Sequence, residues 1–157
     1  MDISAPNREL RYLTGRKLAV FLAAADRIIP AFDSLPSGGT MTTAQVVDWA
    51  LERMEPGLRK RFLALLTVME IMGVAFGARP FSKNSAKARD RQLAWMESGP
   101  SLMRMGFFGL KNYACLGYYT REAVWKAIGY AGPARPDRQY PDTVIRALCR
   151  AEAEVAP

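Results

Sequence analysis

Apolar residues recur at spacings of three and four along most of this chain, which is the period of an amphipathic helix. The clearest series forms a seam suited to packing along another helix, and it comprises Leu58, Phe62, Leu65, Met69, Met72 and Phe76. No segment shows the apolar and polar alternation of a half-buried strand. The pattern predicts an all-α fold, an irregular bundle of about six helices with an extended C-terminal tail.

The first two helices have recognisable start and stop residues. Thr14 is suited to cap a helix over about 15–29, which Pro30 stops. Its apolar face comprises Leu18, Phe21, Leu22, Ala25 and Ile29. After a turn-rich loop over 31–40, Thr42 or Thr43 is expected to cap a second helix. That helix carries Val46, Trp49, Ala50 and Met54 on its apolar side, and Pro56 and Gly57 separate it from the third helix.

The later helices are divided by glycine and proline. A fourth helix ends near Ser98, before Gly99 and Pro100. The fifth, over about 101–118, is apolar on nearly every side, so we expect it to be central or covered twice. Its glycines at 106, 109 and 117 are expected to admit close approach of another backbone. Thr120 is expected to cap a short sixth helix, which carries Val124, Trp125 and Ile128 and ends at Gly129.

These elements divide the chain into three parts. Residues 1–13 are polar and predict a flexible N-terminal arm, and 14–133 form the helical domain. Residues 134–157 form a C-terminal tail, in which 141–154 can make one last helix. Such a tail is suited to wrapping around a partner. At 157 residues, half of them hydrophobic, the chain can bury one sizeable core.

The composition excludes most enzyme templates. The chain has no histidine, which removes the usual general base near neutral pH and the commonest ligand of metals and haem. Neither dinucleotide nor P-loop glycine motifs occur, and the two cysteines, Cys115 and Cys149, lack CxxC spacing and are interpreted as reduced thiols. We therefore expect no catalytic, cofactor-binding or metal-binding residue in this chain. The acids considered for catalysis are Glu70, expected on the solvent side of its helix, and Asp26, expected to form structural hydrogen bonds.

Charge opens an alternative function. The 22 basic and 15 acidic residues give a net charge of +7, which is compatible with an acidic protein, an anionic membrane surface or nucleic acid. Basic residues gather between 78 and 91 at positions Arg79, Lys83, Lys87, Arg89 and Arg91. A basic helical module that binds nucleic acid is therefore the alternative hypothesis, although this cluster is more typical of a solvated loop and helix start.

The beginning of the first helix imitates a secretory signal. Arg16 and Lys17 precede the apolar stretch 18–25, as charged and apolar regions do in such signals. The apolar face, however, continues through the expected cleavage point to Ile29, which favours a helix of the mature fold. No twin-arginine pair stands near the start, and no apolar run is long enough to span a bilayer.

Two separated blocks of sequence carry a family resemblance. One is DRIIP at Asp26–Pro30, and the other is an ordered series of short blocks in the aromatic-rich stretch 106–133. These blocks are Phe107-Phe108, Gly117–Thr120, Val124-Trp125, Ile128–Tyr130 and Gly132-Pro133. Over roughly 14–136 the chain resembles the gluconate 2-dehydrogenase subunit 3 family, small accessory subunits of flavin-dependent dehydrogenases whose large subunit belongs to the glucose-methanol-choline oxidoreductase group.

The resemblance implies a non-catalytic subunit that supports the folding, stability or export of its partner. The large subunit is then expected to carry FAD and to oxidise a sugar, sugar acid or other alcohol, and a cytochrome c subunit is an optional further partner; nucleic acid is not expected. Relatives with a twin-arginine leader imply a periplasmic location, and the lack of a visible leader keeps a cytoplasmic location as an alternative.

The aromatic-rich stretch supplies the candidate interface. It holds seven of the chain's sixteen aromatic residues, a density suited to a permanent interface, although each aromatic taken singly is more typical of a core. We expect 107–116 to lie in the core of the domain and 118–133 to pass from core to partner surface. The predicted partner-binding residues are Tyr118, Tyr119, Trp125, Tyr130 and Pro133.

Overall fold

A computed structural model describes residues 9–33 and 35–131 as a bundle of helices. The α-helices are α1 (Gly15–Ile28), α2 (Met41–Arg53), α3 (Pro56–Gly77), α4 (Ala86–Ser98), α5 (Ser101–Tyr119) and α6 (Glu122–Ala127), with a 3-10 turn η1 (Phe81–Lys83). In these residues the only β-type pairing is an isolated bridge between Phe32 and Leu35. The all-α prediction is confirmed. The expected tail over 134–157, with its helix over 141–154, lies outside the described residues.

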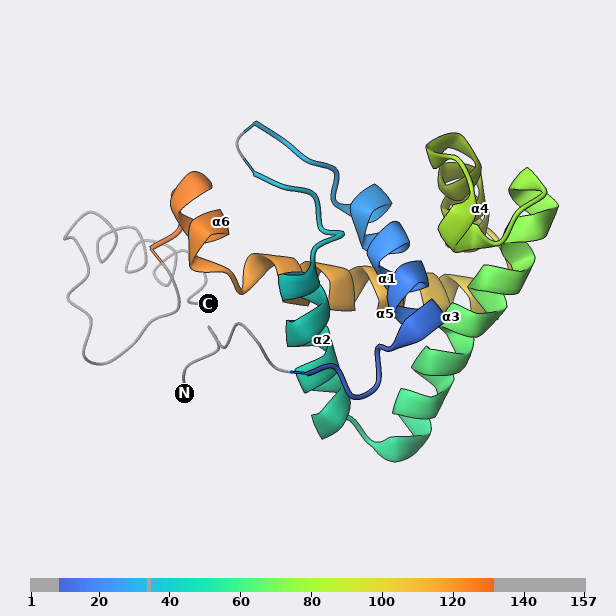
Figure 1. Cartoon of the computed structure of the whole chain (residues 1–157), viewed down its shortest axis with the longest axis horizontal. Helices are drawn as coiled ribbons and strands as arrows, with labels where there is room; N and C mark the ends of the chain where they lie inside the picture. The colour runs from blue at the N-terminus through green and yellow to red at the C-terminus, as the bar shows by residue number, and fades with distance from the viewer. Residues whose placement is uncertain (1–8, 34, 132–157) are drawn as a thin grey trace, which may run out of the picture.

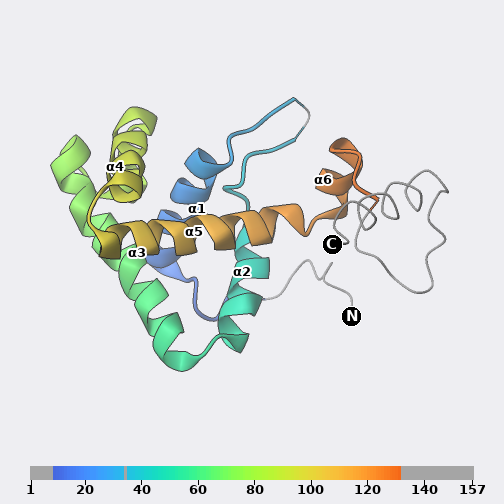
Figure 2. The same cartoon turned by 180° about the vertical axis from the view of Figure 1, so that it is seen from behind.

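Helix α1 occupies the middle of the bundle. It contacts α2, α3, α4, α5 and η1, and α5 runs across the back of the view in Figure 1 and across the near side in Figure 2. The buried residues of α1 are Val20, Phe21, Ala23, Ala24 and Ala25. Because three of these five are alanines, neighbouring helices can approach the α1 backbone closely. The interpretation of 18–25 as a helix of the fold is confirmed.

Of the expected threonine caps, only Thr14 stands at the N-cap position of its helix, and none of them caps through its side chain. Thr14 precedes α1 but its side chain makes no capping hydrogen bond. Helix α2 begins two or three residues earlier than expected, and the Oγ1 of Thr40 accepts the backbone N–H of Thr43. Thr120 closes α5, where its hydroxyl donates to the carbonyl of Leu116 at 3.0 Å. Sequence spacing allows a cap at any nearby threonine, and the backbone path selects one.

The buried face of α2 also differs from the predicted one. Its buried residues are Thr43, Ala44, Val47, Asp48 and Leu51. The predicted side, with Val46, Trp49 and Ala50, is only half-buried. Two of the buried residues are polar, so the apolar pattern alone pointed to the wrong side. On α3 the predicted seam is partly confirmed, because Phe62 and Met69 are buried whereas Leu58 is 53% exposed.

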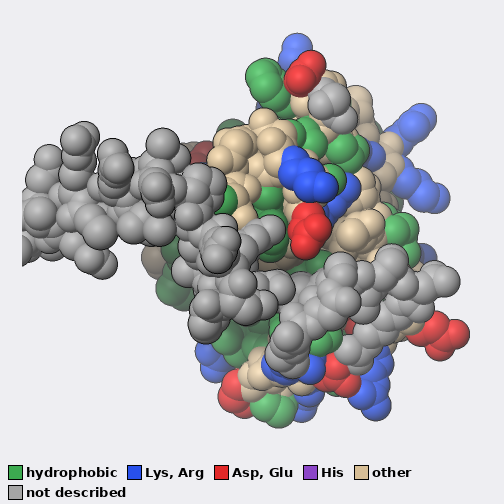
Figure 3. All heavy atoms as spheres, turned by 90° about the vertical axis from the view of Figure 1, so that its left-hand side faces the viewer, with side chains coloured by type: hydrophobic (Ala, Val, Ile, Leu, Met, Phe, Trp, Pro, Cys, Tyr) green, Lys and Arg blue, Asp and Glu red, His purple; other side chains and the backbone are tan. Residues whose placement is uncertain are grey.

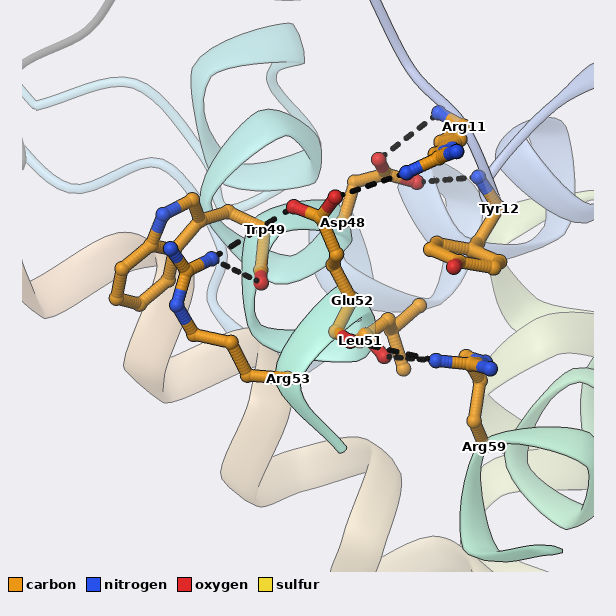
Figure 4. A network of polar contacts seen from close by, with 8 residues as sticks. All are labelled: Arg11, Tyr12, Asp48, Trp49, Leu51, Glu52, Arg53 and Arg59. Carbon is orange, nitrogen blue, oxygen red and sulfur yellow. Dashed lines mark hydrogen bonds and ion pairs between the residues drawn. The ribbon is translucent and has the colours of Figure 1, made fainter. Parts of the chain in front are cut away.

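Asp48 holds the start of the described chain against α2. Its carboxylate, only 1% exposed, accepts the backbone N–H groups of Arg11 (2.9 Å) and Tyr12 (2.8 Å), as Figure 4 shows. It also accepts the backbone N–H of Leu13 at 2.7 Å. Leu13 is fully buried, and the guanidinium of Arg59 lies 4.5 Å from the ring centroid of Tyr12. The expectation of a flexible arm over 1–13 was therefore wrong for residues 11–13, and residues 1–8 lie outside the description.

Two glycines allow helices to touch at the backbone. A Cβ at Gly117 of α5 would lie 2.6 Å from the carbonyl oxygen of Thr43 in α2, as expected for a close approach. A Cβ at Gly73 of α3 would lie 2.1 Å from the backbone nitrogen of Phe81. Gly106 faces the side chain of Leu65, and nothing lies within 4 Å of a Cβ at Gly109, so the expectation fails there.

Candidate partner-binding surface

Helix α5 leaves one apolar face uncovered. Leu110, Ala114, Gly117 and Tyr118 point into the bundle. On the opposite side Leu102, Met105 and Phe108 are each 66% exposed, Tyr119 is 47% exposed and Leu116 is 44% exposed. We call these five residues the α5 outer face. Within residues 9–33 and 35–131 the helix is covered on one side only, so the placement of 107–116 in the core was wrong for Phe108 and Leu116.

The polar residues of α5 stand along and within this face. Arg104, Lys111 and Asn112 are exposed, and no aspartate or glutamate occurs anywhere between Glu97 and Glu122. The apolar side chains of the outer face thus have two cations and an amide as neighbours on the same helix. Partner surfaces typically combine apolar anchors with a polar rim of this kind.

Tyr118 belongs to the core. Its side chain is 3% exposed, and its hydroxyl donates to the carbonyl oxygen of Pro36 at 2.9 Å. Its ring meets that of Tyr119 edge to face with centroids 5.2 Å apart, and the guanidinium of Arg121 lies 5.6 Å from its centroid. Tyr118 therefore fixes the loop before α2 against α5. From its buried position it is suited to support the exposed ring of Tyr119, which it contacts.

Tyr119, Trp125 and Tyr130 form an aromatic group at the end of α5. The indole N–H of Trp125 donates to the backbone carbonyl of Tyr119, and the rings of Trp125 and Tyr130 lie edge to face with centroids 5.8 Å apart. Tyr130 is 50% exposed, and Val124, fully buried, holds α6 on the bundle. These three predicted residues are brought together and reach the surface, while Pro133 lies outside the described residues. Contact of any of them with a partner stays a prediction.

The loop between α1 and α2 presents a further aromatic side chain. Phe32 is 78% exposed, and its N–H and C=O exchange hydrogen bonds with Leu35 at 3.2 and 2.9 Å. The base of the loop is tied by the N–H of Gly38, which donates to Ile29 O at 2.8 Å, and by Ser37 Oγ, which donates to the carboxylate of Asp26 at 2.6 Å. The structural role expected for Asp26 is confirmed, and Phe32 is held on an ordered support.

Two of the five basic side chains in the cluster over 79–91 form hydrogen bonds that serve the fold. The guanidinium of Arg89 donates to the carbonyl oxygens of Phe81 (3.2 Å) and Ser82 (2.7 Å), and that of Arg91 donates to Phe76 O. Such carbonyl contacts hold η1 and α4 against the end of α3. Because Arg89 and Arg91 are engaged with backbone carbonyls, the cluster gives little support to the nucleic-acid alternative, which calls for a continuous basic surface. At the opposite end of the molecule, which Figure 3 shows, the described basic side chains stand among apolar and acidic ones.

An ion pair joins α1 to α4 beside this cluster. Arg27 binds both carboxylate oxygens of Asp90, at 2.7 and 2.9 Å. The hydrogen bond from Arg27 lowers the pKa of Asp90, and the same bond raises the pKa of Arg27. Because Arg27 lies outside the 79–91 cluster, this ion pair ties α1 to α4 without using any of the cluster's own cations.

Glu70, the acid considered for catalysis, is engaged in the structure. It lines an open groove of about 310 Å³ beside Arg16, Lys17 and Thr67. One carboxylate oxygen accepts the backbone N–H of Ser82 and the other accepts its hydroxyl, both at 2.8 Å. The expectation that Glu70 simply faces solvent was incomplete, because the side chain is half-buried and holds η1.

Within residues 9–33 and 35–131, no group of three or more histidine, cysteine or acidic side chains is placed to hold a metal ion. In the same part of the chain, no helix has the length and apolar character needed to cross a bilayer.

Comparison with known proteins adds one result. A family model described as Gluconate 2-dehydrogenase subunit 3 matches residues 16–132. Searches of curated proteins and of solved structures gave no match. The matched range includes α1 except for its first residue, Gly15, and all of α2 to α6, and therefore the whole α5 outer face.

Proposed function

Since this chain belongs to the gluconate 2-dehydrogenase subunit 3 family, we propose that it is a non-catalytic small subunit that binds and stabilises an FAD-dependent dehydrogenase. The family description makes the chain a subunit of a dehydrogenase complex. In our proposal the large subunit carries FAD and the catalytic residues, and it oxidises a sugar, sugar acid or other alcohol. The small subunit holds no cofactor of its own.

The observation that carries this proposal is the uncovered apolar face of α5. Leu102, Met105 and Phe108 are each two-thirds exposed on a helix whose other side is packed in the core. Large apolar patches on a folded surface mark sites of interaction, because burying them against a partner is favourable. A subunit that presents such a face on an ordered helix requires little reorganisation when it binds.

The same proposal extends to the maturation of the complex. A large subunit that exposes a complementary apolar surface before assembly is prone to aggregate, and the small subunit would cover that surface during folding. We place the assembled complex in the periplasm, with a cytochrome c subunit as an optional third component. The cytoplasm is the alternative location, and the presence of the complex in osmotic-shock fractions distinguishes the two.

Co-expression tests the proposal directly. The flavin dehydrogenase large subunit from the same genome is produced with and without this chain, and the yields of soluble, FAD-loaded protein are compared. We expect the two chains to copurify in a fixed ratio and the soluble flavoprotein to decrease strongly when the small chain is omitted. Equal yield, flavin content and dehydrogenase activity without the small chain, together with no copurification, would refute the proposal.

A further inference from the structure

We propose that the α5 outer face docks onto the large subunit, and that this contact is restricted to a partner unlike this chain. The complementary surface would be apolar, with acidic side chains opposite Arg104 and Lys111 and a hydrogen-bonding group opposite Asn112. This inference rests on the proposed function and adds to it the face used and the chemistry of the partner.

The positions on the helix define the shape of the contact. At 100° per residue, Met105, Phe108, Asn112, Leu116 and Tyr119 fall within an arc of about 80°. Arg104 and Lys111 lie together at one edge of that arc, two turns apart, and Leu102 lies at the other edge. From Leu102 to Tyr119 the face is about 25 Å long at 1.5 Å per residue, a length suited to an interface of ordinary size.

Charge disfavours a second copy of this chain as the occupant. Two α5 helices that pair through this face would bring together four cations, Arg104 and Lys111 of each copy. No acid on α5 or its flanking turns could balance them, since none occurs between Glu97 and Glu122. Like charges juxtaposed at an interface oppose association. The occupant therefore has to supply the acidic groups.

Asn112 disfavours a lipid surface as the occupant. Its exposed amide lies inside the apolar arc, between the turns that carry Phe108 and Leu116. Acyl chains offer no hydrogen-bond partner, and burial of an unpaired amide is costly. A helix that lies in a bilayer interface usually has a fully apolar face, whereas α5 has a polar group within the face and cations at one edge only. A protein surface can satisfy both features.

The experiment uses the full chain and its copurified complex. The first variant is Met105→Ser with Phe108→Ser, and the second is Arg104→Glu with Lys111→Glu. The matched control is Ile71→Ser with Val74→Ser on α3, where the two side chains are 68% and 54% exposed. Thermal melting followed by circular dichroism confirms that each free variant is folded, and Kd for the large subunit is measured by titration.

We expect the apolar α5 variant to weaken binding at least about 30-fold, the effect of losing one central anchor. The charge reversal should weaken it about tenfold and reduce its dependence on salt. The α3 control should stay within about threefold of the wild type, since exposed residues outside an interface contribute little. If the wild type binds and both α5 variants bind equally well, the inference fails while the proposed function stands. If the wild type does not bind, the proposed function itself fails.

Side-chain footprinting and two further measurements test whether this face is instead covered by this chain itself, by a second copy of the chain or by a lipid surface. Met105 and Phe108 should be labelled by hydroxyl radicals in the free chain and protected in the complex. Protection already present in the free chain would overturn the inference, because the face would then be covered by this chain itself. Dimerisation in sedimentation equilibrium, or binding to phosphatidylserine vesicles, that is lost in the Met105→Ser, Phe108→Ser variant would likewise overturn it.

Discussion

Replacement of Asp48 tests how the start of the described chain is held. Asp48→Ala removes a buried carboxylate that accepts three consecutive backbone N–H groups, from Arg11, Tyr12 and Leu13. Figure 4 shows the carboxylate of α2 aimed at this segment, with the ring of Tyr12 beside Arg59. Loss of the carboxylate should release the segment and uncover Leu13, which is fully buried.

The magnitude follows from the three bonds. The N–H of Leu13 is buried, and an unpaired buried donor costs about 1–3 kcal/mol. The N–H groups of Arg11 and Tyr12 are partly accessible and can bind water instead, so each lost bond costs about 1 kcal/mol. We therefore expect Asp48→Ala to lower the free energy of unfolding by about 3–5 kcal/mol. Asp48→Asn keeps one oxygen to accept two N–H groups and should cost about 1–3 kcal/mol.

Urea unfolding at neutral pH, followed by circular dichroism, measures these differences. The control is Glu52→Gln, one turn further along α2, whose carboxylate pairs with Arg11 at 3.0 Å in a more accessible place. That change should cost at most about 1 kcal/mol. If Asp48→Ala unfolds within about 1 kcal/mol of the wild type, these hydrogen bonds do not anchor the segment and the reasoning is refuted.

Three further predictions concern packing, the loop and pH. Gly73→Ala places a methyl group 2.1 Å from the backbone nitrogen of Phe81. The substitution should lower the free energy of unfolding by about 3 kcal/mol or more. A melting temperature equal to that of the wild type would contradict the close contact. Tyr118→Phe should lower the free energy of unfolding by about 1 kcal/mol and speed limited proteolysis within 31–40. An unchanged cleavage rate would argue against a role for the Tyr118–Pro36 hydrogen bond in holding this loop. The lowered pKa of Asp90 means that its pairing with Arg27 stabilises above the ordinary pKa of 3.8 and is lost as the pH falls through the folded value. Asp90→Asn should therefore lower the free energy of unfolding by at most about 1 kcal/mol at pH 7, and it should have no effect below the folded-state pKa of Asp90. An equal loss of stability in acid would count against a stabilising ion pair with Arg27.

The candidate surface could be anticipated only in part. The aromatic stretch led to Tyr119, Trp125 and Tyr130, which the structure brings together at the end of α5. Sequence reasoning missed Leu102 and Met105 and placed Phe108 in the core. Residue type alone does not distinguish an apolar side chain on an exposed helix face from one that is buried. The signal that could have found them was the apolar character of α5 on all sides without any acid nearby. A helix of that composition needs more cover than the described residues provide.

The sequence by itself determined the helical class and most helix boundaries. Pro30, Pro56, Gly99 and Pro100 interrupt the helical period locally, through fixed backbone angles and missing N–H donors, so these breaks need no knowledge of distant residues. Only the tertiary structure decided which side of a helix is buried. Asp48 turns inward because three N–H groups from the preceding segment pair with it, and Tyr118 does so because Pro36 accepts its hydroxyl. Both partners are distant in sequence, and such non-local pairing leaves no periodic trace.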